Sequence, residues 1–314
     1  MPTLTSNQPL NTNLKVLETV MNGYKAGIKT FSPKGQLVFN QVDPVRATEL
    51  ISVTQGLGLP QVTGQAGTYF TTDINEYGSK AVDQVRYTNS FAYSKLMRRF
   101  DHVDILSKST AQGTFRTLQR KDDIMAAILR GSATTTTTYD NLSLLNGSHT
   151  VGTTGLTQTN ITTGGVTEPN LITAIANMYQ MLDENGLVGE LDTCYILYPP
   201  VMDNTIKRFL HSEGSPTTAN RYTNPLMGEA NIQTGEKIQL IPWARLGAAA
   251  GGSDTTAYLV SNKMFHNLMY LEAIGPETTV VTPDKTNNGS YEVRFELHAA
   301  AVVPHYYGIW GITA

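Results

Sequence analysis

The sequence has a single cysteine, Cys194, so the chain cannot form an internal disulfide. It also lacks any stretch of about 18 apolar residues, the length that a membrane-spanning helix needs. Its first residues show no basic segment followed by an apolar run, so no signal peptide is recognised. These absences lead us to expect a protein that is made and kept in a cytoplasm-like compartment. Cys194 opens the apolar run of residues 194–198, which predicts a buried strand with the thiol as a small hydrophobic group.

Charged residues are also scarce, at 16% of the chain against about 25% in an ordinary soluble protein. Neutral polar residues and glycine take their place. Because the centres of protein–protein interfaces are depleted in charge, this composition favours surfaces that become buried against neighbouring subunits. The formal net charge of −3 argues against a protein that grips nucleic acid through its phosphates.

One local concentration of cations is interleaved with carboxylates. The cations are Arg98, Arg99, Arg116, Arg120 and Lys121, and the carboxylates among them are Asp101, Asp104, Asp122 and Asp123. We interpret this segment as a solvated or intersubunit face rather than a track for phosphates.

No motif for catalysis, cofactor binding or metal binding is recognisable. Gly56-Leu57-Gly58 lacks the third glycine of a phosphate-binding loop. The histidines are scattered without the spacing of a metal site, at His102, His149, His211, His266, His298 and His305. We therefore expect no catalytic, cofactor-binding or metal site, and no enzymatic activity.

Three local groups of residues are the strongest candidates for chemistry in this sequence. Residues 101–104 combine two aspartates with a histidine, but adjacent helical positions point apart, which favours a charge cluster at a helix start. Ser148 and His149 could pair as nucleophile and base, but no orienting acid is identifiable. Asp183 and Glu184 follow an apolar helix and are expected to be solvated. Two histidines among apolar C-terminal strands are expected to be structural: His298 and His305.

The first hundred residues pack poorly by themselves. Residues 1–37 are polar apart from one short stripe of Leu14, Leu17 and Met21, so we expect an extended arm. Residues 44–59 predict a short amphipathic helix. Residues 60–99 are rich in threonine, glycine and spaced aromatics, which predicts a long two-stranded hairpin. An isolated hairpin is marginal in water, so it would need a neighbouring subunit to lie on.

The rest of the chain alternates between helical and strand patterns. Residues 104–131 carry apolar residues at helical spacing and end at a glycine, which predicts a long spine helix. A threonine-rich linker of residues 132–167 follows, then a helix capped by Thr167 that is expected to run to Gly186. The remaining expected elements are a strand at 194–198, a short helix at 201–210, a strand at 238–242, a loop tip at 247–252, and strands at 258–260, 278–282, 293–303 and 306–312.

The order of these elements, with several short motifs, resembles the major capsid proteins of tailed bacteriophages. The motifs are Leu144-Leu145-Asn146-Gly147-Ser148-His149, Asp183-Glu184-Asn185-Gly186, Tyr198-Pro199-Pro200, Asn224-Pro225 and Tyr306-Tyr307-Gly308-Ile309-Trp310-Gly311. The similarity covers roughly residues 86–314 and is closest to the Mu-type major head subunits, although their histidine-rich segment is reduced here to Ser148-His149.

The resemblance implies an α+β, HK97-like capsid fold. Its expected parts are an N-terminal arm and short helix (1–59), an extended hairpin or E-loop (60–99), the spine helix, linker and second helix of a peripheral domain (100–186), an axial domain (187–246), and an axial loop with C-terminal peripheral strands (247–314). We expect copies to form hexamers and pentamers of an icosahedral virion shell around double-stranded DNA, contacted weakly and without sequence specificity.

The resemblance also implies further partners, namely a scaffolding protein, a portal and a head-maturation protease, with assembly in the host cytoplasm. Because the chain begins almost at the arm, we expect a separate scaffold or a processed precursor. Lys80 lies in the expected hairpin, but covalent crosslinking through it is not expected. The alternatives are a bacterial nanocompartment shell with the same fold, another virion protein such as a decoration or tail protein, and an unrecognised enzyme.

Overall fold

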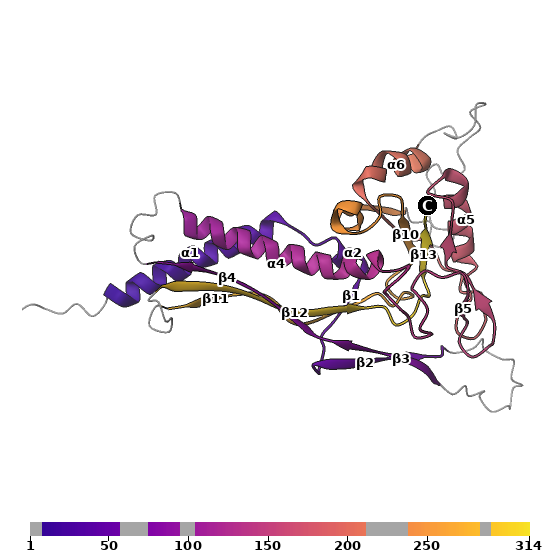
Figure 1. The fold of residues 1–314 in the computed structure, drawn as a ribbon, viewed down its shortest axis with the longest axis horizontal. Coiled ribbons are helices and arrows are strands. Elements are labelled where there is room, and N and C mark those ends of the chain that lie inside the picture. Colours follow the sequence, from indigo (N-terminus) through magenta and orange to yellow (C-terminus); the bar gives the residue numbers. More distant parts are fainter. Residues whose placement is uncertain (1–7, 57–74, 95–103, 212–237, 283–289) are drawn as a thin grey trace, which may run out of the picture.

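The structure is a computed structural model that describes residues 8–56, 75–94, 104–211, 238–282 and 290–314. It is elongated, with a long helix lying along a four-stranded sheet at one end and a second, five-stranded sheet at the other (Figure 1). Three clusters of buried apolar residues lie along this length. No helix within these ranges is long and apolar enough to cross a membrane.

The spine of the molecule is helix α4, Ile105–Arg130, which confirms the long helix expected at residues 104–131. Its 26 residues correspond to about 39 Å at ~1.5 Å per residue. Gly113 is required within it, because a Cβ there would lie 2.2 Å from the Phe295 ring. Gly131 closes the helix by donating its backbone N–H to Ala127 O at 3.0 Å.

The four-stranded sheet under α4 has the order β1-β11-β12-β4. Its strands are β1 Asn40–Val42, β11 Met269–Val281, β12 Tyr291–Val302 and β4 Val85–Tyr93. In β12 the buried residues Val293, Phe295 and Leu297 alternate with more exposed neighbours, as the sequence predicts for a strand with one buried face. The antiparallel β11–β12 pair confirms the expected C-terminal hairpin, whose turn at residues 287–289 lies outside the described residues.

The expected extended arm is wrong for the described part of residues 1–37. Residues 8–30 form helix α1, Gln8–Thr30, which packs along α4. Val16 and Val20 are buried, while two members of the stripe seen in the sequence, Leu17 and Met21, are exposed. The arm prediction failed because α1 gains its stability from α4, a partner that is distant in sequence.

The expected helix at residues 44–59 is also wrong, since strand β2, Thr48–Thr54, lies there. It pairs antiparallel with β3, Glu76–Asp83. The next strand, β4, does not pair with β3 but joins β12 over nine residue pairs. The hairpin expected within residues 60–99 is therefore displaced toward the N-terminus, and the nine residues of β4 belong to the main sheet instead. Residues 60–74 and 95–99 of the expected hairpin lie outside the described residues. The β2–β3 pair stands away from the main sheet (Figure 1).

The second sheet has the order β7-β13-β10-β8-β9. Its strands are β7 Ile161–Thr162, β13 Ile309–Ile312, β10 Ala257–Val260, β8 Tyr195–Tyr198 and β9 Gln239–Pro242. Strands β8 and β9 confirm two of the expected strands, and β13 is shorter than the expected strand at 306–312. Cys194 precedes β8 and is half-buried, so its expected full burial is wrong.

Helices α5, Glu168–Tyr179, and α6, Asp203–His211, accompany this sheet (Figure 1). Thr167 Oγ1 accepts the backbone N–H of Asn170, which confirms the expected cap. The helix ends at Tyr179 rather than at Gly186, because residues 182–188 form a turn closed by a Leu182–Val188 bridge. The short elements are α2 Gly35–Val38, β5 His149–Thr150, β6 Thr157–Gln158 and 3-10 turns at Pro200–Met202, Ala244–Leu246 and Ala248–Ala250.

Candidate assembly surfaces

The base of the β2–β3 hairpin is attached to the body by aromatic packing. The Tyr77 ring on β3 meets the Tyr139 ring edge-on at 4.9 Å between centroids. Gly78 allows this approach, because a Cβ there would lie 2.9 Å from Tyr139 Cβ. The Lys80 amine donates to Thr137 Oγ1 at 2.6 Å. The hairpin base is thus fixed to the segment that follows α4.

A second attachment involves the turn after α5. Gln55 Nε2 donates to Asn185 Oδ1 at 2.7 Å, and Asn185 Nδ2 donates back to Gly56 O at 3.0 Å. The neighbouring Glu184 is largely buried, so the expectation that Asp183 and Glu184 are simply solvated is wrong. Burial raises the pKa of the Glu184 carboxyl group.

Glu184 shares its surroundings with a buried histidine. His305 Nδ1 accepts the backbone N–H of Tyr307 at 2.8 Å, so Nε2 carries the proton of the neutral ring. Nε2 lies 4.0 Å from Glu184 Oε1, too far for a hydrogen bond. Burial lowers the pKa of His305 to about 3. His305 is therefore a neutral ring that stacks on both Tyr139 and Tyr306, consistent with the structural role expected for it.

His149 has the acid partner that the sequence did not reveal. Its Nδ1 lies 2.7 Å from Asp140 Oδ2, and its Nε2 lies 3.1 Å from Leu144 O. Burial disfavours the Asp140 anion, but hydrogen bonds from His149 and Thr138 outweigh it and lower the pKa to about 2. Ser148 Oγ instead approaches Asn146 Oδ1. Both ring nitrogens thus contact groups other than Ser148, and these contacts hold residues 140–149 together.

The other polar residues singled out in the sequence are those at 101–104 and His298. Residues 101–103 lie outside the described residues, and Asp104 precedes α4 in an exposed position. His298 Nε2 lies 2.6 Å from Glu296 Oε1, as a satisfied surface histidine would. Within the described ranges, His, Cys, Asp and Glu form no group of three suited to a metal ion.

The cations that the sequence places together are separated by the fold. Lys121 is buried in an ion pair with Glu272 at 2.8 Å, and Arg120 pairs with Asp123 at 3.0 Å. Arg98 and Arg99 lie outside the described residues. Of this group, Arg116 bonds only to the neutral Gln119 and lies near the Phe115 ring. Two of the described cations are thus neutralised within the chain itself, and the solvated or intersubunit face expected for this segment stays a prediction.

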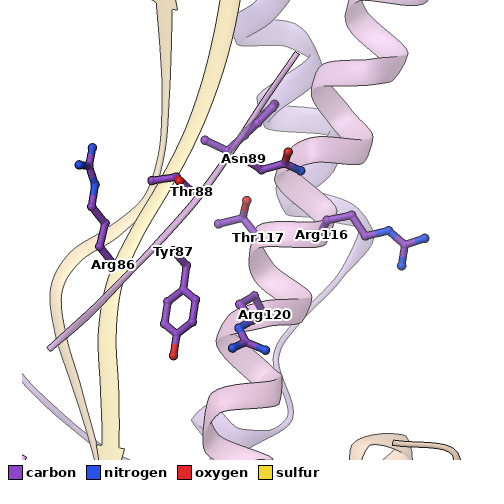
Figure 2. A pocket seen from close by; sticks show the side chains of 8 residues that line it. Arg86, Tyr87, Thr88, Asn89, Arg116, Thr117 and Arg120 are labelled. Atoms are coloured by element: carbon purple, nitrogen blue, oxygen red, sulfur yellow. The ribbon is translucent and has the colours of Figure 1, made fainter. Parts of the chain in front are cut away.

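A groove runs between β4 and α4. It consists of two adjoining hollows of about 490 and 430 Å³ that share Asn89, Arg116 and Phe295 as lining residues. In Figure 2, Tyr87 and Arg120 approach each other across the space between strand and helix, while Arg86 and Arg116 splay outward at its two sides. The guanidinium of Arg120 lies 4.4 Å from the Tyr87 ring centre. We call this feature the β4–α4 groove.

A model of one protein family, described as phage capsid protein, matches residues 76–312, well over half of the chain. The chain belongs to the phage capsid protein family. Its function is therefore that of a structural subunit of a capsid shell. No curated protein sequence matches this capsid protein.

Solved capsids share the fold of this capsid protein at low sequence identity. The capsid of Ralstonia phage GP4 is 11% identical over 87% of this chain and 86% of its own, with a TM-score of 0.54. The capsid of Myoviridae phage XM1 is 15% identical over 90% of each chain, with a TM-score of 0.52. A virus-like particle from Pyrococcus furiosus is 6% identical over 94% and 98%, with a TM-score of 0.53. These likenesses confirm the expected α+β, HK97-like fold.

Proposed function

We propose that this capsid protein forms the hexamers and pentamers of an icosahedral phage head that encloses double-stranded DNA. The observation that carries the proposal is the family match over residues 76–312, on a chain whose β2–β3 hairpin stands away from its main sheet. A two-stranded ribbon is marginal in water. A neighbouring subunit would supply the surface it lacks, and several contacts per subunit would stabilise a shell that no single pair could.

The division into parts belongs to this proposal, with two amendments, to the E-loop and to the N-terminal arm. The E-loop corresponds to the β2–β3 hairpin, which begins at Thr48 rather than at residue 60. Helix α4 with the four-stranded sheet corresponds to the peripheral domain, and residues 187–246 to the axial domain. Helix α1 takes the place of the extended arm.

The partners follow from the same proposal. A separate scaffolding protein, a portal and a maturation protease would act with the shell, which would assemble in the host cytoplasm. A net charge of −3 suits a wall that contacts packaged DNA only weakly. The short motifs of the sequence favour the Mu-type head subunits as the nearest subgroup, and no catalytic step is assigned to the chain.

A nanocompartment shell is the second candidate, because the Pyrococcus furiosus virus-like particle has a similar fold. The match to a phage capsid family favours a head subunit. Electron microscopy and sedimentation of the purified chain, alone and with its scaffold, test the proposal. Closed shells or rings of six and five subunits are expected. A uniform monomer or dimer under every condition would contradict it, and shells that take up a cargo enzyme instead of DNA would favour the nanocompartment.

A further inference from the structure

Helix α1 carries an apolar stripe that is separate from its contact with α4. The positions of the stripe are spaced alternately by four and three residues, as the a and d positions of a heptad repeat are. They are Leu10, Leu14, Leu17, Met21, Tyr24 and Ile28. The side chains of Leu17, Met21 and Ile28 are 44%, 49% and 44% exposed, although α1 packs along α4. We call these six positions the α1 seam.

The α1 seam and the buried face of α1 point in different directions. At about 100° per residue, the seam positions fall within a sector of about 80° around the helix. The buried face, which meets α4, consists of Val16, Val20, Gly23 and Gly27. It lies roughly 110° from the middle of the seam. Tyr24 Oη donates to Pro276 O at 2.9 Å, which ties the middle of the seam to β11. Helix α1 thus has two packing faces, one buried and one largely open.

The spacing of the α1 seam fits a second helix. A strand presents its side chains with a period of two, which does not match an alternation of three and four. A narrow a/d stripe is instead the contact surface of two helices that pack side by side. Because α4 already holds α1 in its helical form, an incoming helix would not have to offset the entropy of ordering α1. The seam is therefore a preformed surface for a helix.

The charge beside the α1 seam favours an acidic partner. On the flank that faces away from α4, α1 carries three exposed lysines, Lys15, Lys25 and Lys29, and the carboxylate of Glu18. Among the described residues, none of these lysines has a carboxylate within ion-pair distance. Residues that flank the a and d positions choose the partner of a helix by opposite charge. Glutamates on an incoming helix would give these lysines the partners that they lack.

One further carboxylate faces the seam from the sheet. Burial and then the charge of Glu277 raise the pKa of Tyr24, so Glu277 on β11 lies near the middle of the seam. The three lysines still exceed the two carboxylates, and they lie on the exposed flank of α1. A second copy of α1 would bring the same excess of lysine against this one, and like charges placed together oppose association. The charge therefore favours a different protein over a second copy of this chain.

We propose that the α1 seam docks an acidic amphipathic helix of a different protein, with the apolar residues of that helix on the seam and its glutamates beside the three lysines. The surface belongs to a single subunit, so this inference does not rest on the proposed shell function. Exposed ion pairs contribute little to affinity, so apolar contact supplies most of the binding free energy. The charges decide which helix is accepted.

Fluorescence anisotropy with a labelled peptide tests the docking on the full-length, unassembled chain. The probe is a peptide of about three heptads with isoleucine at a, leucine at d and glutamate at e and g, which discourages its own pairing. Saturable binding is expected, and Met21→Asp in the seam should weaken it at least about tenfold. Ala26→Asp places the same charge at an exposed position on the opposite side of α1 and should leave binding unchanged. Equal binding by both variants, or no binding to the unmodified chain, would overturn the proposal.

A second peptide, with lysine in place of each glutamate, tests the role of charge. It should bind the unmodified chain at least about tenfold more weakly than the acidic peptide. Lys15→Glu, Lys25→Glu and Lys29→Glu combined should reverse this preference. The control reverses three exposed cations outside α1, namely Arg46, Lys207 and Arg208. Equal binding of the two peptides to the unmodified chain, or a reversal in the control as well, would overturn the acidic assignment. Self-association of the chain that Met21→Asp abolishes would overturn the proposal in favour of a second copy.

Discussion

The indole Nε1 of Trp243 donates a 2.7 Å hydrogen bond to Asp122 Oδ2, and both side chains are buried. The other carboxylate oxygen of Asp122 accepts the backbone N–H of Gly35 at 3.0 Å. One side chain of α4 thereby joins α2 on one side to the segment after β9 on the other. Burial raises the pKa of Asp122, although these donors partly offset the shift.

We predict that Asp122→Ala lowers the free energy of unfolding by about 2–4 kcal/mol, because two buried donors lose their acceptor. Urea unfolding of the unassembled subunit measures the change. Asp122→Asn keeps one acceptor oxygen and should fall between Asp122→Ala and the unmodified chain. Equal stability of all three proteins would show that water replaces the carboxylate.

The buried ion pair between Lys121 and Glu272 gives a second prediction. Lys121→Met should cost about 3–5 kcal/mol, because it leaves the Glu272 charge buried without its cation. Replacing both residues with apolar ones should recover most of that loss. Lys207→Met removes the exposed pair with Asp203 and should lower the free energy of unfolding far less, because water screens that pair. Similar losses in the two single variants would contradict the distinction between buried and exposed pairs.

The contact between α1 and α4 depends on glycine. A Cβ at Gly27 would lie 2.7 Å from Ala111 O and from Thr114 Cβ. Gly27→Leu should therefore push α1 off α4 and make the tryptic sites at Lys25 and Lys29 more rapidly cleaved. Ala26→Leu adds similar bulk at an exposed neighbour and should leave the cleavage rate unchanged. Equal cleavage of both variants would mean that α1 is held elsewhere.

Two buried histidines predict how stability depends on pH. Burial lowers the pKa of His266 to about 4 and of His305 to about 3. In the unfolded chain each titrates near its ordinary pKa of about 6.5, so acid favours unfolding. Stability should be fully present above pH ~6.5 and fall at lower pH, by up to about 1.4 kcal/mol per unit for each histidine, until the folded pKa is reached.

Urea unfolding of the unassembled subunit between pH 7.5 and 4.5 measures this slope. His266→Gln should flatten it, because one of the two buried imidazoles is then absent. A stability that is constant or that rises as the pH falls over this range would contradict the assignment of neutral, buried imidazoles.

Local signals in the sequence predicted the elements that are stabilised locally. Helix α4 has helical spacing and a terminal glycine, and α5 has the Thr167 cap, so both were found with their starts nearly correct. The alternation in β12 likewise identified its buried face. Where pairing with a segment distant in sequence determines the secondary structure, the local apolar pattern gave a wrong prediction. Apolar residues at 47, 50 and 51 fit one helical turn, yet pairing with β3 makes the segment a strand.

The same limit applies to the assembly surfaces. In α1 the apolar stripe visible in the sequence includes two exposed residues, Leu17 and Met21. The buried face instead uses Val16, Val20 and two glycines, and glycine adds little to a hydrophobic pattern. The Asp140–His149 contact arises from a turn in which Asp140 also accepts the Leu142 N–H, and no motif spacing marks it. The sequence alone does not predict the β4–α4 groove, because tertiary packing brings its two walls, β4 and α4, together.

Because α4 is long, a small change in its angle would move its far end by a large distance. Its C-terminal end is embedded in the largest apolar cluster, whereas its N-terminal end belongs to a much smaller one with α1 and the far ends of β11, β12 and β4. A tilt of ~10° about the embedded end would move the other end of a ~39 Å rod by ~7 Å. A slight angular adjustment in one subunit can therefore set a large difference in curvature, so that one sequence can suit both flatter and more sharply bent positions.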